Sequence, residues 1–251
     1  MISDMSMSAR QSMGVYLREA KYEFVRIFRS PSTIPALLVP CLFYLFFGVY
    51  LGNVSGPASA TRVLATYVHW TAFGVMGPGM FGFGVSVALE RDQGLLALKR
   101  ALPMPPAAYL LAKMVISTAF AAVITITITV ASILFAHPSL SVAQFVAVGI
   151  IATLGALPFS AIGLFIGTRV PGQSAAGIVY LVYIPAMLLA GLFFPVPKAI
   201  EYVSPAFYLD QLMARAADLK VSDSIFIHIS VLSVLTLTLT FLSVRKLARV
   251  G

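Results

Sequence analysis

The residues of this 251-residue chain that are best suited to binding chemistry lie in one short segment, 90–113. It opens with the charged cluster Glu90-Arg91-Asp92, and Leu95, Leu98 and Leu102 then recur every three or four residues, which predicts a short amphipathic helix. A proline cluster ends this helix. We predict that the segment binds a protein partner through charged and apolar residues: Glu90, Arg91, Asp92, Gly94, Leu95, Leu98, Lys99 and Arg100. The alternative is a solvated connector in which these side chains have no role.

Glu90 lies at the end of the apolar segment that precedes this helix. We expect its carboxylate to accept hydrogen bonds from the free N-terminal amides of the helix, or to pair with Arg91, Lys99 or Arg100. A negative charge near an exposed helix N-terminus contributes about 0.3–1 kcal/mol. That is too little to decide folding, but it can set the angle at which the helix leaves the membrane.

Motifs of covalent catalysis and nucleotide hydrolysis do not occur in the sequence. The chain has no Gly-Lys dipeptide, and therefore no P-loop, and it has no His-Glu-x-x-His or Gly-x-Ser-x-Gly. Its three histidines, His69, His137 and His228, are isolated in the sequence without carboxylate neighbours, and Cys41 is the single cysteine. We therefore predict no catalytic residue, no metal site and no cofactor in this chain. A membrane enzyme that uses an interfacial residue such as His69 is a competing hypothesis.

Composition places the chain among integral membrane proteins. Apolar residues make up 59% of it and charged residues only 10%, against about 25% in soluble domains. All 17 basic and 9 acidic residues lie outside six apolar segments, and a helix needs about 20 apolar residues to cross a membrane. We predict an all-α membrane protein in one domain, 1–251, with spans 34–52, 63–89, 114–136, 143–168, 174–194 and 225–244. The run 123–130 alternates like a strand, but it lies within the third apolar segment and is assigned to the helix.

The distribution of charge predicts the orientation of these spans. If the N-terminus is cytoplasmic, that side carries 13 basic and 5 acidic residues, and the other side carries 4 of each. An excess of Lys and Arg marks the cytoplasmic side of a membrane protein. We therefore predict that both termini and the 90–113 segment lie in the cytoplasm. A nucleic-acid partner is not needed to explain the basic balance.

Three other segments have a distinctive composition. Residues 13–30, within a cytoplasmic tail 1–33, mix apolar and basic side chains and predict an interfacial elbow helix. Residues 193–215 are aromatic and interrupted by proline, which predicts short helices at the outer interface. Residues 74–84 contain five glycines and a proline, and such a stretch either packs helices tightly or breaks a helix beside a cavity. The predicted spans contain no charged residue, so any driving energy must come from outside the membrane, or transport must be passive.

Three sequence patterns occur in the order that is typical of one family. Residues 90–96 read Glu-Arg-Asp-Gln-Gly-Leu-Leu and are followed by Pro103 and Lys113, residues 185–195 run from proline to proline through Ala190-Gly191, and residues 204–210 combine a proline, a tyrosine and an aspartate. Together with six spans, these patterns resemble the permease subunits of the type-2 ABC exporter family. Three positions differ from the residues that are usual in that family: Leu95 replaces Thr, Ala97 replaces Glu and Ala190 replaces Ser.

This resemblance implies a homodimer of permeases in contact with membrane lipids and bound to two separate P-loop ATPase subunits, which would hold ATP and Mg²⁺ in their own sites. It implies export of a drug, lipid or glycan across a bacterial inner membrane. The helix after span 2 would be a coupling helix that carries ATPase motion into the spans, with 169–173 as a second contact. Spans 2 and 5 would line the route, which makes these residues candidates: Met76, Gly77, Met80, Phe81, Phe83, Pro185, Met187 and Leu188. A membrane scaffold or assembly subunit that moves nothing is the alternative hypothesis.

Overall fold

The computed structural model describes residues 25, 33–54, 59–95, 106–221 and 223–249. These residues form helices and connecting turns, and the described ranges contain no β-strand. The predicted all-α class is therefore confirmed. The predicted elbow helix and most of the predicted coupling helix lie outside the described residues, so both stay predictions.

Five helices within the described ranges are long and apolar enough to cross a membrane. The first is one continuous run, Ala60–Asp92, built from α4 (Ala60–Gly77), the π-helix η2 (Pro78–Val85) and α5 (Ser86–Asp92). The five helices correspond to the predicted spans 2 to 6, and residues 123–130 are helical as predicted. The other four helices are α7 (Pro106–Phe135), α8 (Val142–Gly167), α9 (Gly172–Leu189) and α12 (Ile225–Arg249).

The first predicted span, 34–52, corresponds to a shorter apolar helix. The apolar part of this helix is Leu37–Tyr50, which is shorter than the other five candidate spans. A total of six spans therefore stays a prediction. The helical run consists of three consecutive elements: α2 (Thr33–Phe43), the π-helix η1 (Tyr44–Tyr50) and α3 (Leu51–Val54).

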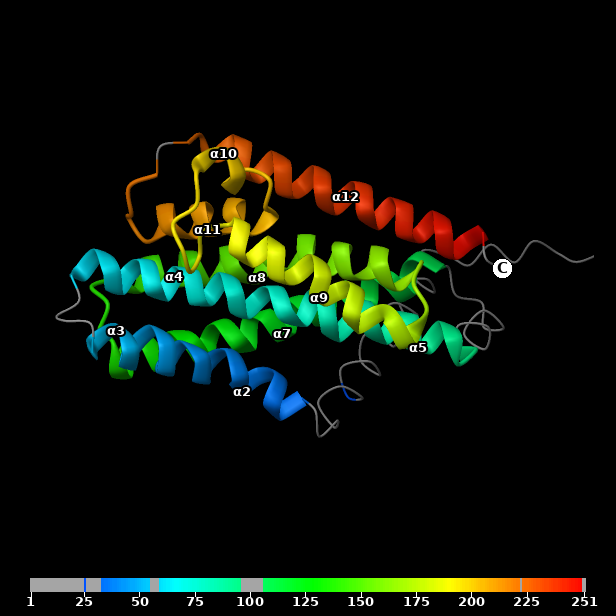
Figure 1. Cartoon of the computed structure of the whole chain (residues 1–251), viewed down its shortest axis with the longest axis horizontal. Coiled ribbons are helices and arrows are strands. Elements are labelled where there is room, and N and C mark those ends of the chain that lie inside the picture. The colour runs from blue at the N-terminus through cyan, green and yellow to red at the C-terminus, as the bar shows by residue number, and fades with distance from the viewer. Residues whose placement is uncertain (1–24, 26–32, 55–58, 96–105, 222, 250–251) are drawn as a thin grey trace, which may run out of the picture.

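The long helices extend along one another, and the chain reverses direction between them (Figure 1). α5 and the last turns of α12 lie at one end of the bundle, which we call the α5 end. The short helices α10 (Lys198–Glu201) and α11 (Pro205–Ala216) lie at the opposite end, which we call the α11 end. They occur where the sequence predicts short helices. α9 ends at Leu189, before the predicted end of span 5, because the chain turns at Gly191 with a φ of +71°.

The glycine-rich segment 74–84 packs tightly against α8. A Cβ atom added to Gly84 would lie 2.6 Å from the carbonyl oxygen of Gly163, and one added to Gly167 would lie closer still to the carbonyl oxygen of Gly84. Both distances are far shorter than a carbon atom can approach, so only glycine lets these two backbones come this close. Of the two roles expected for this segment, tight packing is the one that these contacts show.

Candidate functional site

The end of the span-2 run places three charged side chains against neighbouring helices. α5 ends at Asp92, and Gly94 follows with a φ of +73°, a conformation that glycine adopts without strain and that commonly terminates helices. The amide of Gly94 donates a 3.0 Å hydrogen bond to the carbonyl oxygen of Arg91. Helix α5 therefore stops directly after the charged cluster, and its last turn fixes where these side chains point.

Glu90 belongs to a buried ion pair. Its carboxylate accepts a hydrogen bond of 2.7 Å from the ammonium of Lys113 and one of 2.6 Å from the hydroxyl of Tyr109, and both partners lie on α7. Lys113 is fully buried and also donates to the hydroxyl of Ser86 at 3.3 Å. The ring of Tyr109 lies 5.4 Å from the same ammonium, within the range of a cation–π contact. A charge pair shielded from solvent thus ties α5 to α7.

These partners of Glu90 differ from the ones expected from the sequence. Tyr109 and Lys113 were not among the expected partners, whereas Lys99 and Arg100, which were, lie outside the described residues. The expected contribution of Glu90 to stability is therefore larger. Removing one partner of a buried ion pair costs about 3–5 kcal/mol, whereas an exposed charge at a helix terminus contributes only about 0.3–1 kcal/mol. The buried pair therefore predicts a larger weight of Glu90 in folding than an exposed helix terminus would give it.

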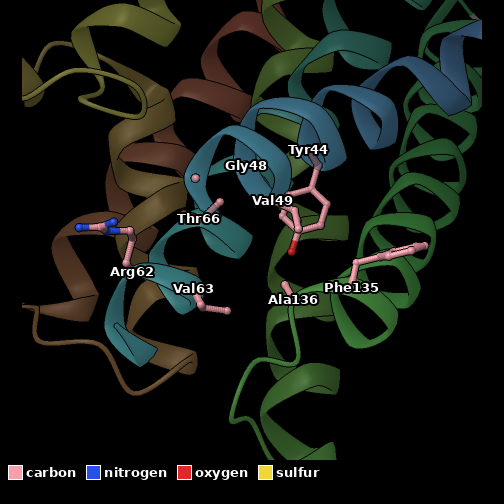
Figure 2. A pocket seen from close by; sticks show the side chains of 9 residues that line it. Tyr44, Gly48, Val49, Arg62, Val63, Thr66, Phe135 and Ala136 are labelled. Atoms are coloured by element: carbon pink, nitrogen blue, oxygen red, sulfur yellow. The ribbon is translucent and has the colours of Figure 1, made fainter. Parts of the chain in front are cut away.

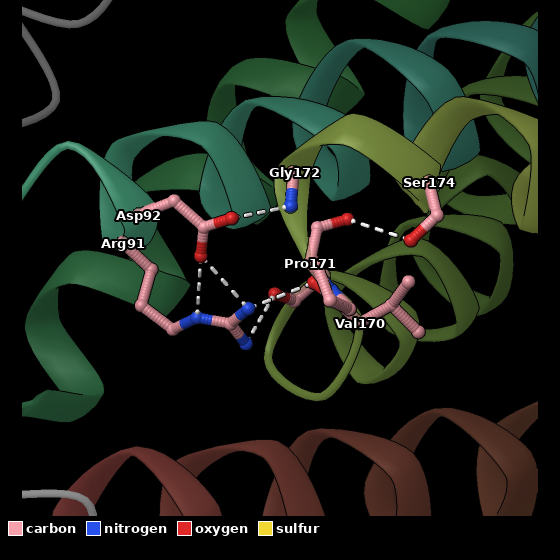
Figure 3. A network of polar contacts seen from close by, with 7 residues as sticks. Arg91, Asp92, Val170, Pro171, Gly172 and Ser174 are labelled. Carbon is pink, nitrogen blue, oxygen red and sulfur yellow. Dashed lines mark hydrogen bonds and ion pairs between the residues drawn. The ribbon is translucent and has the colours of Figure 1, made fainter.

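Arg91 and Asp92 hold the turn between α8 and α9, and we call their contacts the α5 clamp (Figure 3). The guanidinium of Arg91 donates to the carbonyl oxygens of Val170 at 2.8 Å and Gly167 at 3.3 Å, and it pairs with Asp92 at 3.0 Å. The other carboxylate oxygen of Asp92 accepts the backbone N–H of Gly172, the first residue of α9, at 2.6 Å. A carboxylate in this position satisfies a free helix amide and complements the helix dipole. The α5 clamp thereby joins span 2 to the ends of two other spans.

Arg169 extends these contacts to the last helix. Its guanidinium donates to the carbonyl oxygens of Phe165 at 3.1 Å and Leu242 at 3.2 Å, and it lies 3.7 Å from the centre of the Phe165 ring. Partial burial lowers the pKa of the Arg169 guanidinium below its usual value. Arginine nevertheless stays charged in proteins, so the cation–π contact persists at any physiological pH. The turn predicted as a second partner contact therefore also binds α12.

The remaining predicted contact residues lie farther along the same segment. Leu95 is the last described residue before the gap and is exposed. Leu98, Lys99 and Arg100 lie outside the described residues. The structure therefore gives inward contacts for the cluster 90–92, and the partner-binding role of the later residues stays a prediction.

The predicted route residues fall into three groups. One group is buried in the core of the chain: Met76, Met80 and Phe83. Phe81 instead reaches α9, where its ring centre lies 4.3 Å from that of Tyr180 and 5.2 Å from that of Tyr183. The last group is partly or fully exposed: Gly77, Pro185, Met187 and Leu188. Spans 2 and 5 therefore do meet at Phe81, while the route itself stays a prediction.

A small cavity lies between η1, α4 and the end of α7 (Figure 2). Its volume is about 70 Å³, whereas sites for drug-sized molecules have volumes of about 300–1,000 Å³. The hydroxyl of Tyr44 is buried beside it and has no hydrogen-bond partner among the described residues, so the cavity is suited to water. It is too small to be the route for a drug or glycan. Its lining consists of Tyr44, Gly48, Val49, Gly52, Arg62, Val63, Thr66, Phe135 and Ala136.

The structure also brings together a pair that the sequence analysis missed. Nδ1 of His69 on α4 lies 2.7 Å from Oδ1 of Asp210 on α11, although 141 residues separate the two. The interpretation that His69 has no carboxylate neighbour is therefore wrong in three dimensions. The one clue in the sequence is that Asp210 ends the third family-like pattern. Within the described ranges, three or more His, Cys, Asp or Glu side chains do not gather in a group that could hold a metal ion.

Comparison with known proteins gives two findings. Residues 17–214 match the family described as ABC-2 type transporter, which covers most of the chain. The chain is also similar to a Bacillus subtilis (strain 168) protein named "Putative transport permease YvfS". The two are 28% identical over 184 residues, which cover 73% of this chain and 75% of that protein.

Proposed function

The chain belongs to the ABC-2 type transporter family, and from this membership we propose that it is the transmembrane permease subunit of an ATP-powered exporter. The ATPase would be a separate P-loop protein that binds ATP and Mg²⁺, because this sequence has no P-loop. Two copies of the chain would bind two such subunits. Together they would move a hydrophobic, lipid-like or glycan substrate out of the cytoplasm.

The observation that carries the proposal is the α5 clamp. A transporter driven by a separate ATPase needs a cytoplasmic element whose displacement reaches the spans. At the α5 end, Arg91 contacts the last turn of α8 and the loop after it, and Asp92 contacts the first residue of α9. A displacement of α5 would therefore move α8 and α9 with it. We propose that this is how ATPase motion enters the spans.

The charged cluster and the leucines then have different roles. Glu90, Arg91 and Asp92 use their described contacts inside the chain, so we propose that they position α5 rather than touch the ATPase. Contact with the ATPase is left to the exposed Leu95 and to Leu98, Lys99 and Arg100 beyond it. Gly94 would be the joint between the two groups, because its backbone reverses direction there.

We also propose that the α5 end faces the cytoplasm of a bacterial cell, with the protein in the inner membrane. The excess of Lys and Arg in the segments that flank this end supports the orientation. Both termini would then be cytoplasmic, and the α11 end would face outward. Export from the cytoplasm would require the substrate to leave through the α11 end.

Reconstitution with an ATPase tests the proposal. The chain should copurify with a soluble P-loop ATPase when the two are coexpressed, and ATP hydrolysis should require that second protein. Leu98→Asp should weaken the complex, whereas the conservative Leu98→Met should not. ATP hydrolysis by the purified chain alone, or a chain that binds no ATPase, would refute the permease assignment and, in the second case, favour the scaffold alternative.

A further inference from the structure

We propose that the hydrogen bond between His69 and Asp210 is the contact by which span 2 positions α11, so that α11 follows the movement of span 2. This inference rests on the proposed function. It assigns to His69 and Asp210 a positioning role at the end of the bundle opposite the α5 clamp. Through this pair, the α11 end of the molecule would move together with the α5 end, which receives the ATPase motion.

The geometry of α11 supports this role. Nδ1 of His69 lies 2.7 Å from Oδ1 of Asp210, and the two side chains are 30% and 3% exposed. The N-cap of α11, Ser204, donates a hydrogen bond to the carbonyl oxygen of Ala186 on α9. The other contacts of α11 with the bundle are largely apolar, such as Leu209 against Gly155 and the ring of Phe207 6.0 Å from that of His228. Within the described part of the chain, the pair is the only hydrogen bond that joins side chains of α11 and the span-2 run.

Because Asp210 is buried, its contact with His69 restrains the position of α11 more strongly than an apolar contact would. A carboxylate that is almost completely removed from water needs a hydrogen-bond donor, and the imidazole of His69 supplies one. An apolar contact tolerates small sliding movements, whereas a hydrogen bond of 2.7 Å weakens steeply when its atoms move apart or out of line. Asp210 therefore fixes the position of α11 along α4 in a way that its leucine and phenylalanine contacts do not.

The same helical run carries both ends of the proposed link. His69 and Arg91 belong to the continuous run Ala60–Asp92 and are 22 positions apart, a separation of about 33 Å at the rise of an α-helix. The close backbone contact of Gly84 with Gly163 holds the middle of this run against α8. A displacement at the α5 end therefore reaches Asp210 along one run of helix, without an intervening loop. Since α11 lies at the end through which an exported substrate would leave, its position would follow the ATPase cycle.

Thiol accessibility of α11 in the purified chain tests the positioning contact directly. Cys41 is replaced by serine, and the buried Ala214 of α11 is replaced by cysteine as a reporter for a maleimide. His69→Ala leaves the buried carboxylate with only the longer 3.5 Å contact from the side-chain amide of Gln211 and should raise the labelling rate about a hundredfold. His69→Asn, which can place an amide N–H where Nδ1 lies, should restore slow labelling. The double variant His69→Ala/Asp210→Ala should label more slowly than His69→Ala alone, because the unpaired charge is gone.

Two further variants keep the test decisive. Asp210→Asn retains an oxygen acceptor for the imidazole and should label at close to the parent rate. It therefore tests the contact in a variant that folds, even if the His69→Ala protein does not. His137→Asn is the matched control, because His137 is exposed and its left-handed backbone is one that asparagine tolerates. Unchanged labelling in His69→Ala, or an equal increase in His137→Asn, would overturn the positioning contact. These measurements need neither ATPase nor substrate, so they can fail independently of the proposed function.

The link to ATPase motion is tested in the complex with the same reporter. ATP should change the labelling rate of the cysteine at position 214 in the parent complex. His69→Ala should abolish that change while ATP hydrolysis continues, and His69→Asn should restore it. An ATP response that survives His69→Ala, or one lost equally in His69→Asn, would show that α11 does not follow span 2 through this pair.

Discussion

Replacing Lys113 with methionine tests the buried ion pair at the α5 end most sharply. Methionine keeps an unbranched chain of similar length but removes the ammonium that lies 2.7 Å from the Glu90 carboxylate. The carboxylate keeps its hydrogen bond from Tyr109 but stays buried without that cation. Breaking a buried pair in this way should lower the free energy of unfolding by about 3–5 kcal/mol. Glu90→Gln should have a similar cost, because it leaves the fully buried ammonium of Lys113 without the carboxylate.

The double variant Glu90→Gln/Lys113→Met distinguishes a buried pair from a surface pair. With both charges gone, no charge of the pair is left buried, so stability should recover most of what either single variant loses. A surface pair would instead give single losses of about 0–1 kcal/mol and little coupling. Thermal unfolding of the purified chain, followed by loss of the helical circular-dichroism signal, measures all three variants against the exposed control Lys220→Met. Single variants as stable as the control would refute the reasoning.

Three other predictions concern the same fold. A cysteine placed at position 138 or 220 should react with an impermeant thiol reagent from outside the cell and one at position 93 should not; strong external labelling at 93 would reverse the orientation. Asp92→Ala removes the acceptor of the Gly172 amide, and because such a contact contributes about 1 kcal/mol, hydrogen exchange of that amide should become about fivefold faster. Asp92→Asn should give an intermediate rate, and unchanged exchange would argue against the α5 clamp. Arg91→Gln should reduce ATP hydrolysis by the complex more than Arg62→Gln at the opposite end, and equal effects would contradict the assigned role of Arg91.

The five long helices could be predicted from composition because a membrane span has a strong and simple requirement. Each needs a long run without charge, and the described structure places helices over all five of those runs. The ends were less predictable. Apolar residues continue to Phe194, yet α9 ends at Leu189 because the turn at Gly191 depends on backbone conformation and not on polarity.

The contacts of the candidate site could not be derived from spacing along the chain. Lys113 lies one residue before the predicted third span and was counted among the cytoplasmic charges, whereas in the structure it is fully buried against Glu90. His69 and Asp210 meet only because α11, a short helix between the last two spans, folds back against α4. Such pairs depend on how helices pack, and the periodicity of one segment carries no information about its neighbours.

Helix geometry explains why three adjacent charges make three different contacts. Successive residues of an α-helix point about 100° apart, so a run of three faces most of the surroundings of the last turn. Glu90 contacts α7, Arg91 contacts the turn after α8, and Asp92 contacts the start of α9. A single charge could fix α5 to only one of these neighbours and would leave the helix free to pivot. Together the three charges hold α5 at two places, α7 and the α8–α9 turn, which is the restraint a lever needs if its displacement is to move the spans together.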